Sequence, residues 1–78
     1  MIMDSRGEIL DVVAGWPGLV REIHVAVGDM VEQDQELFTF ESMKMLSPVP
    51  APASGRVTAI HVSVDEFVDT GARLLTIE

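Results

Sequence analysis

The sequence repeats itself once, at an offset of 37 residues, and this repeat limits the folds open to the chain. A chain with a fixed period carries one supersecondary unit that buries its apolar face against a copy of itself. Two copies do not make a solenoid, so the sequence predicts one small domain with pseudo-two-fold symmetry. The matching positions are Gly18, Val20, Ile23, His24, Val25, Val27, Val31, Leu37, Thr39 and Glu41, which recur as Gly55, Val57, Ile60, His61, Val62, Val64, Val68, Leu74, Thr76 and Glu78.

Each copy has the pattern of short β-strands. Ile23, Val25 and Val27 alternate with other residues, as do their counterparts in the second copy, and this period of two is typical of a strand with one buried face. Val20 and Val57 break the alternation at equivalent places. If they also point inward, a bulge or bend follows each of them. Segments with glycine and proline between the apolar runs predict turns. The fold class is therefore all-β.

Composition excludes several classes of function. The formal net charge of −8 over 78 residues argues against nucleic acid, which requires a basic face. Absence of cysteine excludes disulfides and thiolate metal ligands and fits a reducing compartment. No apolar run approaches the ~20 residues that cross a bilayer, and the N-terminus does not resemble a signal peptide. We therefore expect a cytoplasmic protein that is a monomer in isolation.

Lys44 is the only lysine of the chain. It stands between two strand-like runs, residues 37–40 and 45–49, where a reversal is expected. Two-residue hairpin turns are normally built from Asn-Gly, Asp-Gly or Gly-Gly, because they need positive φ. Met43-Lys44 suits such a turn poorly. A conflict between local preference and the global fold is where function is expected.

Glu41-Ser42-Met43-Lys44-Met45 resembles the Glu-Ala-Met-Lys-Met attachment motif of biotinyl carrier domains. The flanking chain is similar to that family from about Gly7 to Glu78. The resemblance implies a flattened barrel of two four-stranded antiparallel sheets, with the lysine hairpin at one end and both termini at the other. It places an N-terminal tail at residues 1–6 and the biotinyl domain at residues 7–78. No proline- or alanine-rich linker precedes residue 7, which favours a free-standing carrier.

The resemblance also implies a function. A biotin protein ligase would attach biotin covalently to Lys44 and would recognise the residues around it, Glu41, Ser42, Met43 and Met45. The biotin would then carry a carboxyl group between a biotin carboxylase and a carboxyltransferase, as subunits or domains. The chain itself would be a non-catalytic carrier of a biotin-dependent carboxylase, with the acetyl-CoA carboxylase type favoured. Ser42, in place of the usual alanine, could slow recognition by the ligase.

Two other functions stay open. A lipoyl carrier has the same fold and the same lysine on a hairpin, but Met-Lys-Met is the biotin pattern, so lipoate is the less favoured cofactor. An unmodified structural or adaptor domain would make the unique lysine a coincidence. His24 and His61 occupy equivalent positions but are expected to face solvent on separate strands, which does not favour a metal site. Trp16 is expected to act as a lid on the core.

Overall fold

The structure, a computed structural model, describes residues 9–78, and within this range it consists of eight strands and connecting turns without a helix. The predicted tail at residues 1–6 lies outside the described residues. Because residues 9–78 contain no helix, no helix in this part of the chain could span a membrane. The strands are β1 (Leu10–Val13), β2 (Gly18–Ile23), β3 (Met30–Val31), β4 (Glu36–Ser42), β5 (Met45–Pro50), β6 (Gly55–Ile60), β7 (Phe67–Val68) and β8 (Arg73–Ile77).

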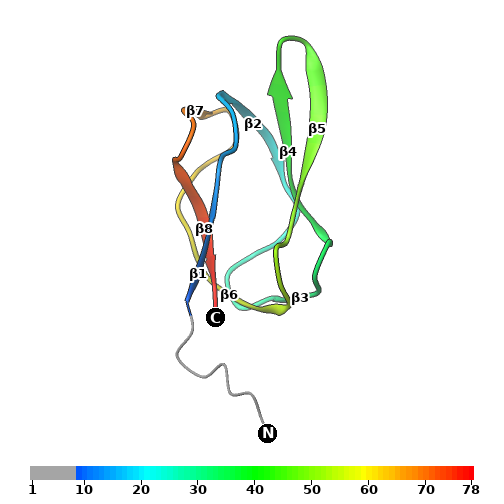
Figure 1. Cartoon of the computed structure of the whole chain (residues 1–78), viewed down its shortest axis with the longest axis vertical. Helices are drawn as coiled ribbons and strands as arrows, with labels where there is room; N and C mark the ends of the chain where they lie inside the picture. Colours follow the sequence, from blue (N-terminus) through cyan, green and yellow to red (C-terminus); the bar gives the residue numbers. More distant parts are fainter. Residues whose placement is uncertain (1–8) are drawn as a thin grey trace, which may run out of the picture.

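The strands form two four-stranded antiparallel sheets, in the orders β1-β8-β6-β3 and β5-β4-β2-β7 (Figure 1). The 37-residue repeat superimposes β2 on β6 and β3 on β7, and it exchanges β1 with β5 and β4 with β8. One sheet is therefore the repeat image of the other, strand by strand. The all-β prediction and its pseudo-two-fold symmetry are confirmed.

Bulges occur where Val20 and Val57 break the alternation. The pairing of β2 with β4 shifts between Val20 and Glu22, and that of β6 with β8 shifts between Val57 and Ala59. Val20 and Val57 are both fully buried. The extra residue lets both valines and the isoleucines that follow point into the same core. The predicted bulge is confirmed in both copies.

The prediction that alternation continues to Val27 and Val64 is wrong. These side chains are 61% and 50% exposed. Strands β2 and β6 end at residues 23 and 60, and the chain then leaves each sheet for a turn. Beyond the end of the sheet, the alternation of faces no longer decides which side chains are buried.

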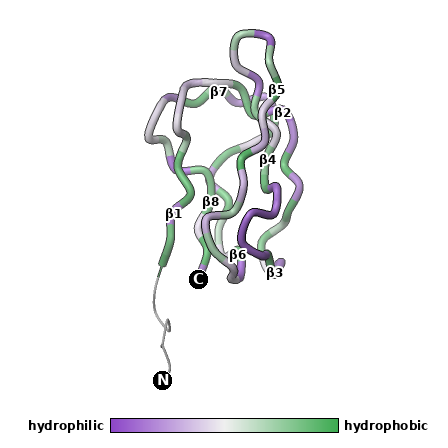
Figure 2. The backbone as a smooth tube through the Cα atoms, turned by 45° about the vertical axis from the view of Figure 1, so that its right-hand side comes forward, coloured by the Kyte–Doolittle hydropathy of each residue, from purple (hydrophilic) through white to green (hydrophobic). Residues whose placement is uncertain are grey.

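The core lies between the sheets, and both copies contribute to it. Its largest fully buried side chains come from β4 and β8, with valines from the other strands: Phe38, Phe40, Leu37, Leu74, Leu75, Ile77, Val20, Val31 and Val57. Figure 2 shows this distribution along the chain, with hydrophobic strands in green and the hydrophilic turn next to β3 in purple. Strands β4 and β8 each lie between two neighbours in their sheet and contribute most of these side chains.

The repeated glycines mark close approaches between strands. A Cβ atom on Gly18 would come within 2.9 Å of the carbonyl oxygen of Glu41, and one on Gly55 within 2.8 Å of that of Glu78. Real Cβ atoms do not approach this closely, so glycine is required at the start of β2 and of β6. The first of these contacts lies at the root of the β4–β5 hairpin.

Candidate functional site

The β4–β5 hairpin extends beyond the rest of the barrel, at the end opposite the C-terminus and the start of β1 (Figure 1). Ser42 pairs with Met45, and Met43 and Lys44 form the two-residue turn between them. Their φ angles are 52° and 66°. Positive φ at both central positions is typical of the type I′ turn, which matches the twist of a hairpin. The predicted turn is present, and it is made of residues that adopt it at a cost.

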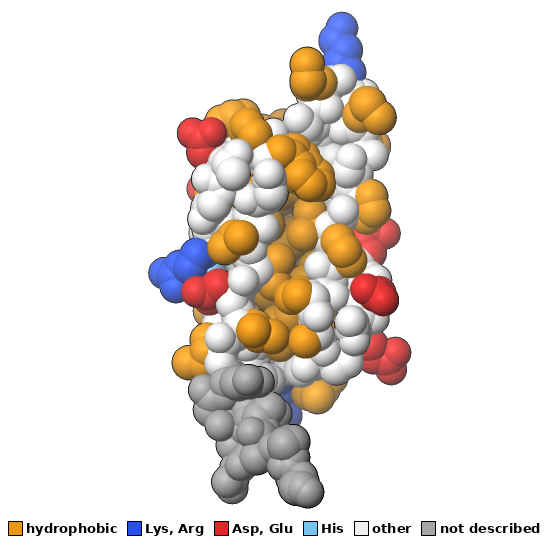
Figure 3. All heavy atoms as spheres, viewed as in Figure 1, with side chains coloured by type: hydrophobic (Ala, Val, Ile, Leu, Met, Phe, Trp, Pro, Cys, Tyr) orange, Lys and Arg blue, Asp and Glu red, His pale blue; other side chains and the backbone are white. Residues whose placement is uncertain are grey.

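The side chains at the tip are exposed. Met43 is 92% exposed and Met45 is 68% exposed, and Lys44 also lies in solvent. Figure 3 shows the basic side chain of the tip at the extreme end of the molecule, with hydrophobic side chains beside it. Filling of the core by Met43 and Met45 is thus excluded. These methionines contribute little buried surface to the fold, but they offer an adaptable apolar surface to a partner.

The root of the hairpin is fixed although its tip is exposed. Strand β4 lies between β5 and β2, so both of its edges are hydrogen-bonded. Phe38 and Phe40 anchor it in the core at 0% and 1% exposure. Glu41 and Ser42 are half-buried where the strand leaves the barrel. The backbone at Lys44 is therefore held close to one position, while its side chain remains free to turn.

Two hollows flank the hairpin. One, of about 370 Å³, is mainly polar and is lined by Arg21, Glu22, Thr39, Glu41, Lys44 and Leu46. The other, of about 580 Å³, is mainly apolar and is lined by Trp16, Pro17, Gly18, Leu19, Glu41, Ser42, Met43 and Phe67. Lys44 and Met43 therefore line different hollows, and Glu41 and its neighbours separate the two.

The polar hollow contains Arg21, which no sequence motif singles out. The Arg21 Nε lies 3.3 Å from Glu41 Oε1, and its Nη1 lies 3.7 Å from Asp65 Oδ1. The signal that could have found Arg21 is the repeat itself. The equivalent residue of the second copy is Thr58, so the two copies differ in charge at this position.

The two histidines contact threonines. His24 Nε2 lies 2.7 Å from Thr39 Oγ1, and His61 Nε2 lies 2.9 Å from Thr76 Oγ1. Among residues 9–78, no group of three histidine, cysteine or acidic side chains is arranged to hold a metal ion. The equivalent hydrogen bonds indicate that the histidines belong to the repeated scaffold.

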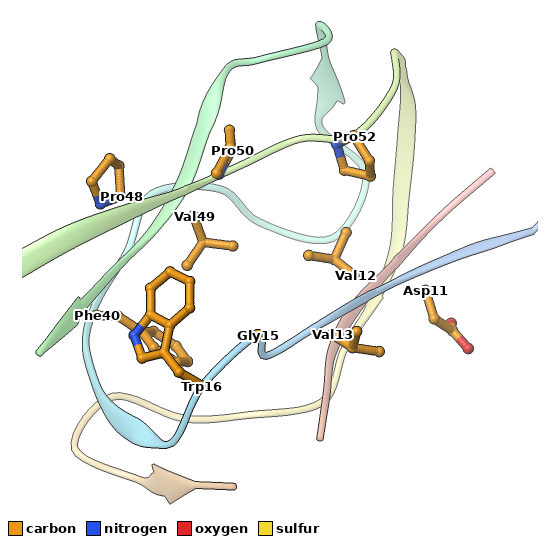
Figure 4. Close-up of a pocket in the computed structure, with 10 residues that line it drawn as sticks. All are labelled: Asp11, Val12, Val13, Gly15, Trp16, Phe40, Pro48, Val49, Pro50 and Pro52. Carbon is orange, nitrogen blue, oxygen red and sulfur yellow. The ribbon is translucent and has the colours of Figure 1, made fainter. Parts of the chain in front are cut away.

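A further hollow of about 360 Å³ lies between β1 and β5 (Figure 4). Trp16 covers Phe40 there, with the ring centroids 6.3 Å apart at 86°. This edge-to-face contact agrees with the predicted role of Trp16 as a lid. Asp11 is the only ionisable side chain in its lining, so an acid, a base and a nucleophile do not meet in this hollow. The complete lining is Asp11, Val12, Val13, Gly15, Trp16, Phe40, Pro48, Val49, Pro50 and Pro52.

Comparison with known proteins gives a family match over almost the whole described chain. The family described as "Biotin-requiring enzyme" matches residues 9–77. The chain is 42% identical over 64 residues to the biotin carboxyl carrier protein of Streptococcus mutans, covering 82% of this chain and 49% of that protein. It is 37% identical over 71 residues to the dihydrolipoyllysine-residue acetyltransferase component of the pyruvate dehydrogenase complex of Pseudomonas aeruginosa, covering 91% and 13% respectively.

Solved structures show the same fold. The Kluyveromyces lactis urea carboxylase matches with a TM-score of 0.85 and 26% sequence identity, over 100% of this chain and 7% of that one. The chain spans about half the length of the Streptococcus mutans carrier protein and far less of the other two proteins. What is shared with all of them is one domain.

Proposed function

The chain belongs to the biotinyl/lipoyl attachment domain family, and we propose that it serves as a biotin carboxyl carrier domain with biotin attached covalently to Lys44. One observation carries this proposal. The only lysine of the chain is exposed at the tip of a rigid hairpin, between two exposed methionines. The residues fit the cofactor, because attachment as an amide requires one accessible primary amine, and the chain offers one on a side chain.

Loading is an acyl transfer to Lys44. The lysine nitrogen forms an amide bond to the biotin carboxyl carbon, which a ligase presents as an adenylate. AMP leaves with the electron pair of the broken bond between the acyl carbon and the phosphate oxygen, and the amine proton passes to solvent. The hairpin contributes exposure and a fixed backbone position, so the ligase meets one geometry. Glu41, Ser42, Met43 and Met45 form the surface by which we propose that the ligase recognises the tip.

After loading, the domain provides position. Bound biotin supplies the ureido nitrogen that carries the carboxyl group. The lysine side chain turns freely on a fixed root, so its end visits two active sites at high effective concentration. We propose a biotin carboxylase and a carboxyltransferase as the partners, in an enzyme of the acetyl-CoA carboxylase type. The negative net charge of −8 would favour encounter with basic faces on these partners.

The test is intact mass after incubation with biotin protein ligase, ATP and biotin, for the wild type and Lys44→Arg. We expect one biotin on the wild type and none on Lys44→Arg, because the guanidinium stays protonated and is not a nucleophile. A folded wild-type chain that gains no mass would contradict the proposal. Addition of biotin to the Lys44→Arg variant would show that the attachment site is not Lys44.

A lipoyl carrier is the second candidate, favoured by the 37% identity to the Pseudomonas aeruginosa acetyltransferase component. Against it stands the Met43-Lys44-Met45 pattern, which resembles the biotin motif. The same mass measurement with lipoyl ligase and lipoate separates the two. Lipoyl addition without biotin addition would replace our proposal with this one.

A further inference from the structure

Arg21 occupies the bulge of β2. The pairing of β2 with β4 shifts between Val20 and Glu22, so Arg21 is the extra residue without an opposite partner. Val20 is fully buried, whereas Arg21 and Glu22 are both exposed. Bulges often redirect a side chain beside a functional site. Here the bulge directs a long basic side chain along the outer face of the sheet, toward the end of β4.

The Arg21 guanidinium bridges two acidic residues from different parts of the barrel. Its Nε lies 3.3 Å from Glu41 Oε1, and its Nη1 lies 3.7 Å from Asp65 Oδ1. Glu41 belongs to β4, three residues before Lys44, and Asp65 lies between β6 and β7. The guanidinium therefore connects the root of the exposed hairpin to the body of the barrel.

The equivalent position that the repeat generates on the other sheet lacks this connection. Thr58 stands in place of Arg21, and it donates a hydrogen bond to the carbonyl oxygen of Thr76 at 3.4 Å. Gly28 stands in place of Asp65, while the acidic residue equivalent to Glu41 is retained as Glu78. Arg21 and Asp65 therefore occur together near Lys44, and uncharged residues replace both of them at the equivalent position.

The backbone at Asp65 makes this difference informative. Asp65 has a φ of 73°, and its counterpart Gly28 has a φ of 99°. A left-handed φ favours glycine, so aspartate at this turn of the second copy costs more than the glycine at the equivalent turn of the first copy. The only ion pair in which Asp65 takes part among residues 9–78 is that with Arg21. In place of the glycine of its counterpart, this turn therefore carries a carboxylate that lies 3.7 Å from the arginine.

We propose that Arg21 is a positioning residue for the loading of Lys44. It acts through Glu41, whose carboxylate it holds in one orientation at the root of the hairpin. Glu41 and Lys44 line the same polar hollow. A carboxylate held by Arg21 is presented to the ligase in one place and is kept from pairing with the lysine amine. This inference rests on the proposed attachment function.

The first test compares Arg21→Thr, which installs the residue of the second copy, with Arg73→Thr. Arg73 is the matched control, because it forms a similar exposed pair with Asp11, at 3.7 Å, on the other sheet. We expect Arg21→Thr to lower kcat/KM for loading about three- to fivefold, the size that an exposed ion pair supports. The loss should come mainly from a higher KM. Arg73→Thr should leave kcat/KM unchanged, and Arg21→Lys should retain more of the wild-type kcat/KM than Arg21→Thr does. Equal kinetics for the two threonine variants would overturn the proposal.

A mutant cycle tests whether Arg21 acts through Glu41. If it does, Arg21→Thr adds no further loss in the Glu41→Gln background. Losses that multiply in the double variant would show that Arg21 acts independently of Glu41. The endpoint mass of the wild type separates the proposed attachment function from the proposed role of Arg21. A wild type that is never loaded contradicts the attachment function itself.

Asp65→Gly separates positioning from simple stabilisation. This variant installs the glycine of the first copy, Gly28, at the equivalent position, so we expect its thermal midpoint to equal or exceed that of the wild type. We also expect its KM for loading to rise, by less than in Arg21→Thr. A variant in which stability and loading efficiency fall together, or in which loading is unchanged, would contradict the role assigned to the bridge.

Discussion

The turns of the barrel body and the turn at the hairpin tip solve the same backbone problem with different residues. In the body, left-handed φ angles occur at Gly28 and its counterpart Asp65, and at Asp34 and its counterpart Gly71. Glycine and aspartate are among the residues that adopt this conformation most easily. At the tip, the same conformation is imposed on a methionine and the only lysine.

This difference shows where the fold has been adapted to a purpose other than stability. Type I′ turns are most stable with Asn-Gly, and nothing in the packing of an exposed tip compensates for the choice of Met43-Lys44. Backbone cost that persists without a packing gain is expected at functional positions. The body turns hold the barrel together, and the tip turn displays one amine.

Truncation of a core residue should produce the largest change in stability. Leu74→Ala removes a fully buried side chain of β8, and its counterpart Leu37→Ala does the same in β4. We expect each to lower the free energy of unfolding by about 2–5 kcal/mol, measured by urea denaturation. Lys44→Ala should leave it nearly unchanged. A loss at Lys44 comparable to that at Leu74 would mean that the tip is part of the structural core.

Substitution of Met43 by asparagine should separate stability from loading. Asparagine accepts positive φ more readily, so we expect Met43→Asn to raise the free energy of unfolding by roughly 1 kcal/mol. The exposed apolar side chain is lost at the same time, so loading of Lys44 by the ligase should slow. Both quantities come from one preparation, by denaturation and by a timed mass assay. Faster loading by the stabilised variant would break the contrast between tip and body.

Relief of a body turn should give the smallest effect. Asp34→Gly restores the residue of its counterpart Gly71 at a φ of 74°. We expect a gain of roughly 0.5 kcal/mol in the free energy of unfolding and no change in the rate of loading. This variant is also the control for Asp65→Gly, which alters an equivalent kind of turn beside Arg21. A change in loading caused by Asp34→Gly would show that body turns also affect the tip.

The repeat made most of the fold predictable from sequence. Equivalent glycines, valines and threonines gave the strand class, the pseudo-two-fold symmetry and both bulges, because each feature had to hold twice. Comparison of the copies could not reveal that the buried face ends before Val27. The chain leaves the sheet at the same place in both copies, so the apolar alternation continues past the strand end in each. The division into two four-stranded antiparallel sheets came from the family resemblance, and the order of the strands came from the structure alone. Pairing between distant strands depends on packing that local alternation does not specify.

The candidate site was predictable as far as single residues carry the signal. Lys44 stood out by its uniqueness and by its poor fit to a turn. Arg21 did not, because an arginine in a strand-like run is ordinary until the structure shows that it lies in a bulge and reaches Glu41. The exposure of Met43 and Met45 was expected from their place beside Lys44, and the structure excludes the alternative that they fill the core.

The central claim is that Lys44 accepts biotin, and competition in one reaction tests it most directly. The wild-type chain is incubated with biotin protein ligase, lipoyl ligase, both cofactors and ATP, and the product is analysed by intact mass and by peptide mapping around the tip. The account predicts one biotin on the peptide that contains Lys44, with little or no lipoyl product. Predominant lipoylation, or a folded chain that remains unmodified, would contradict it.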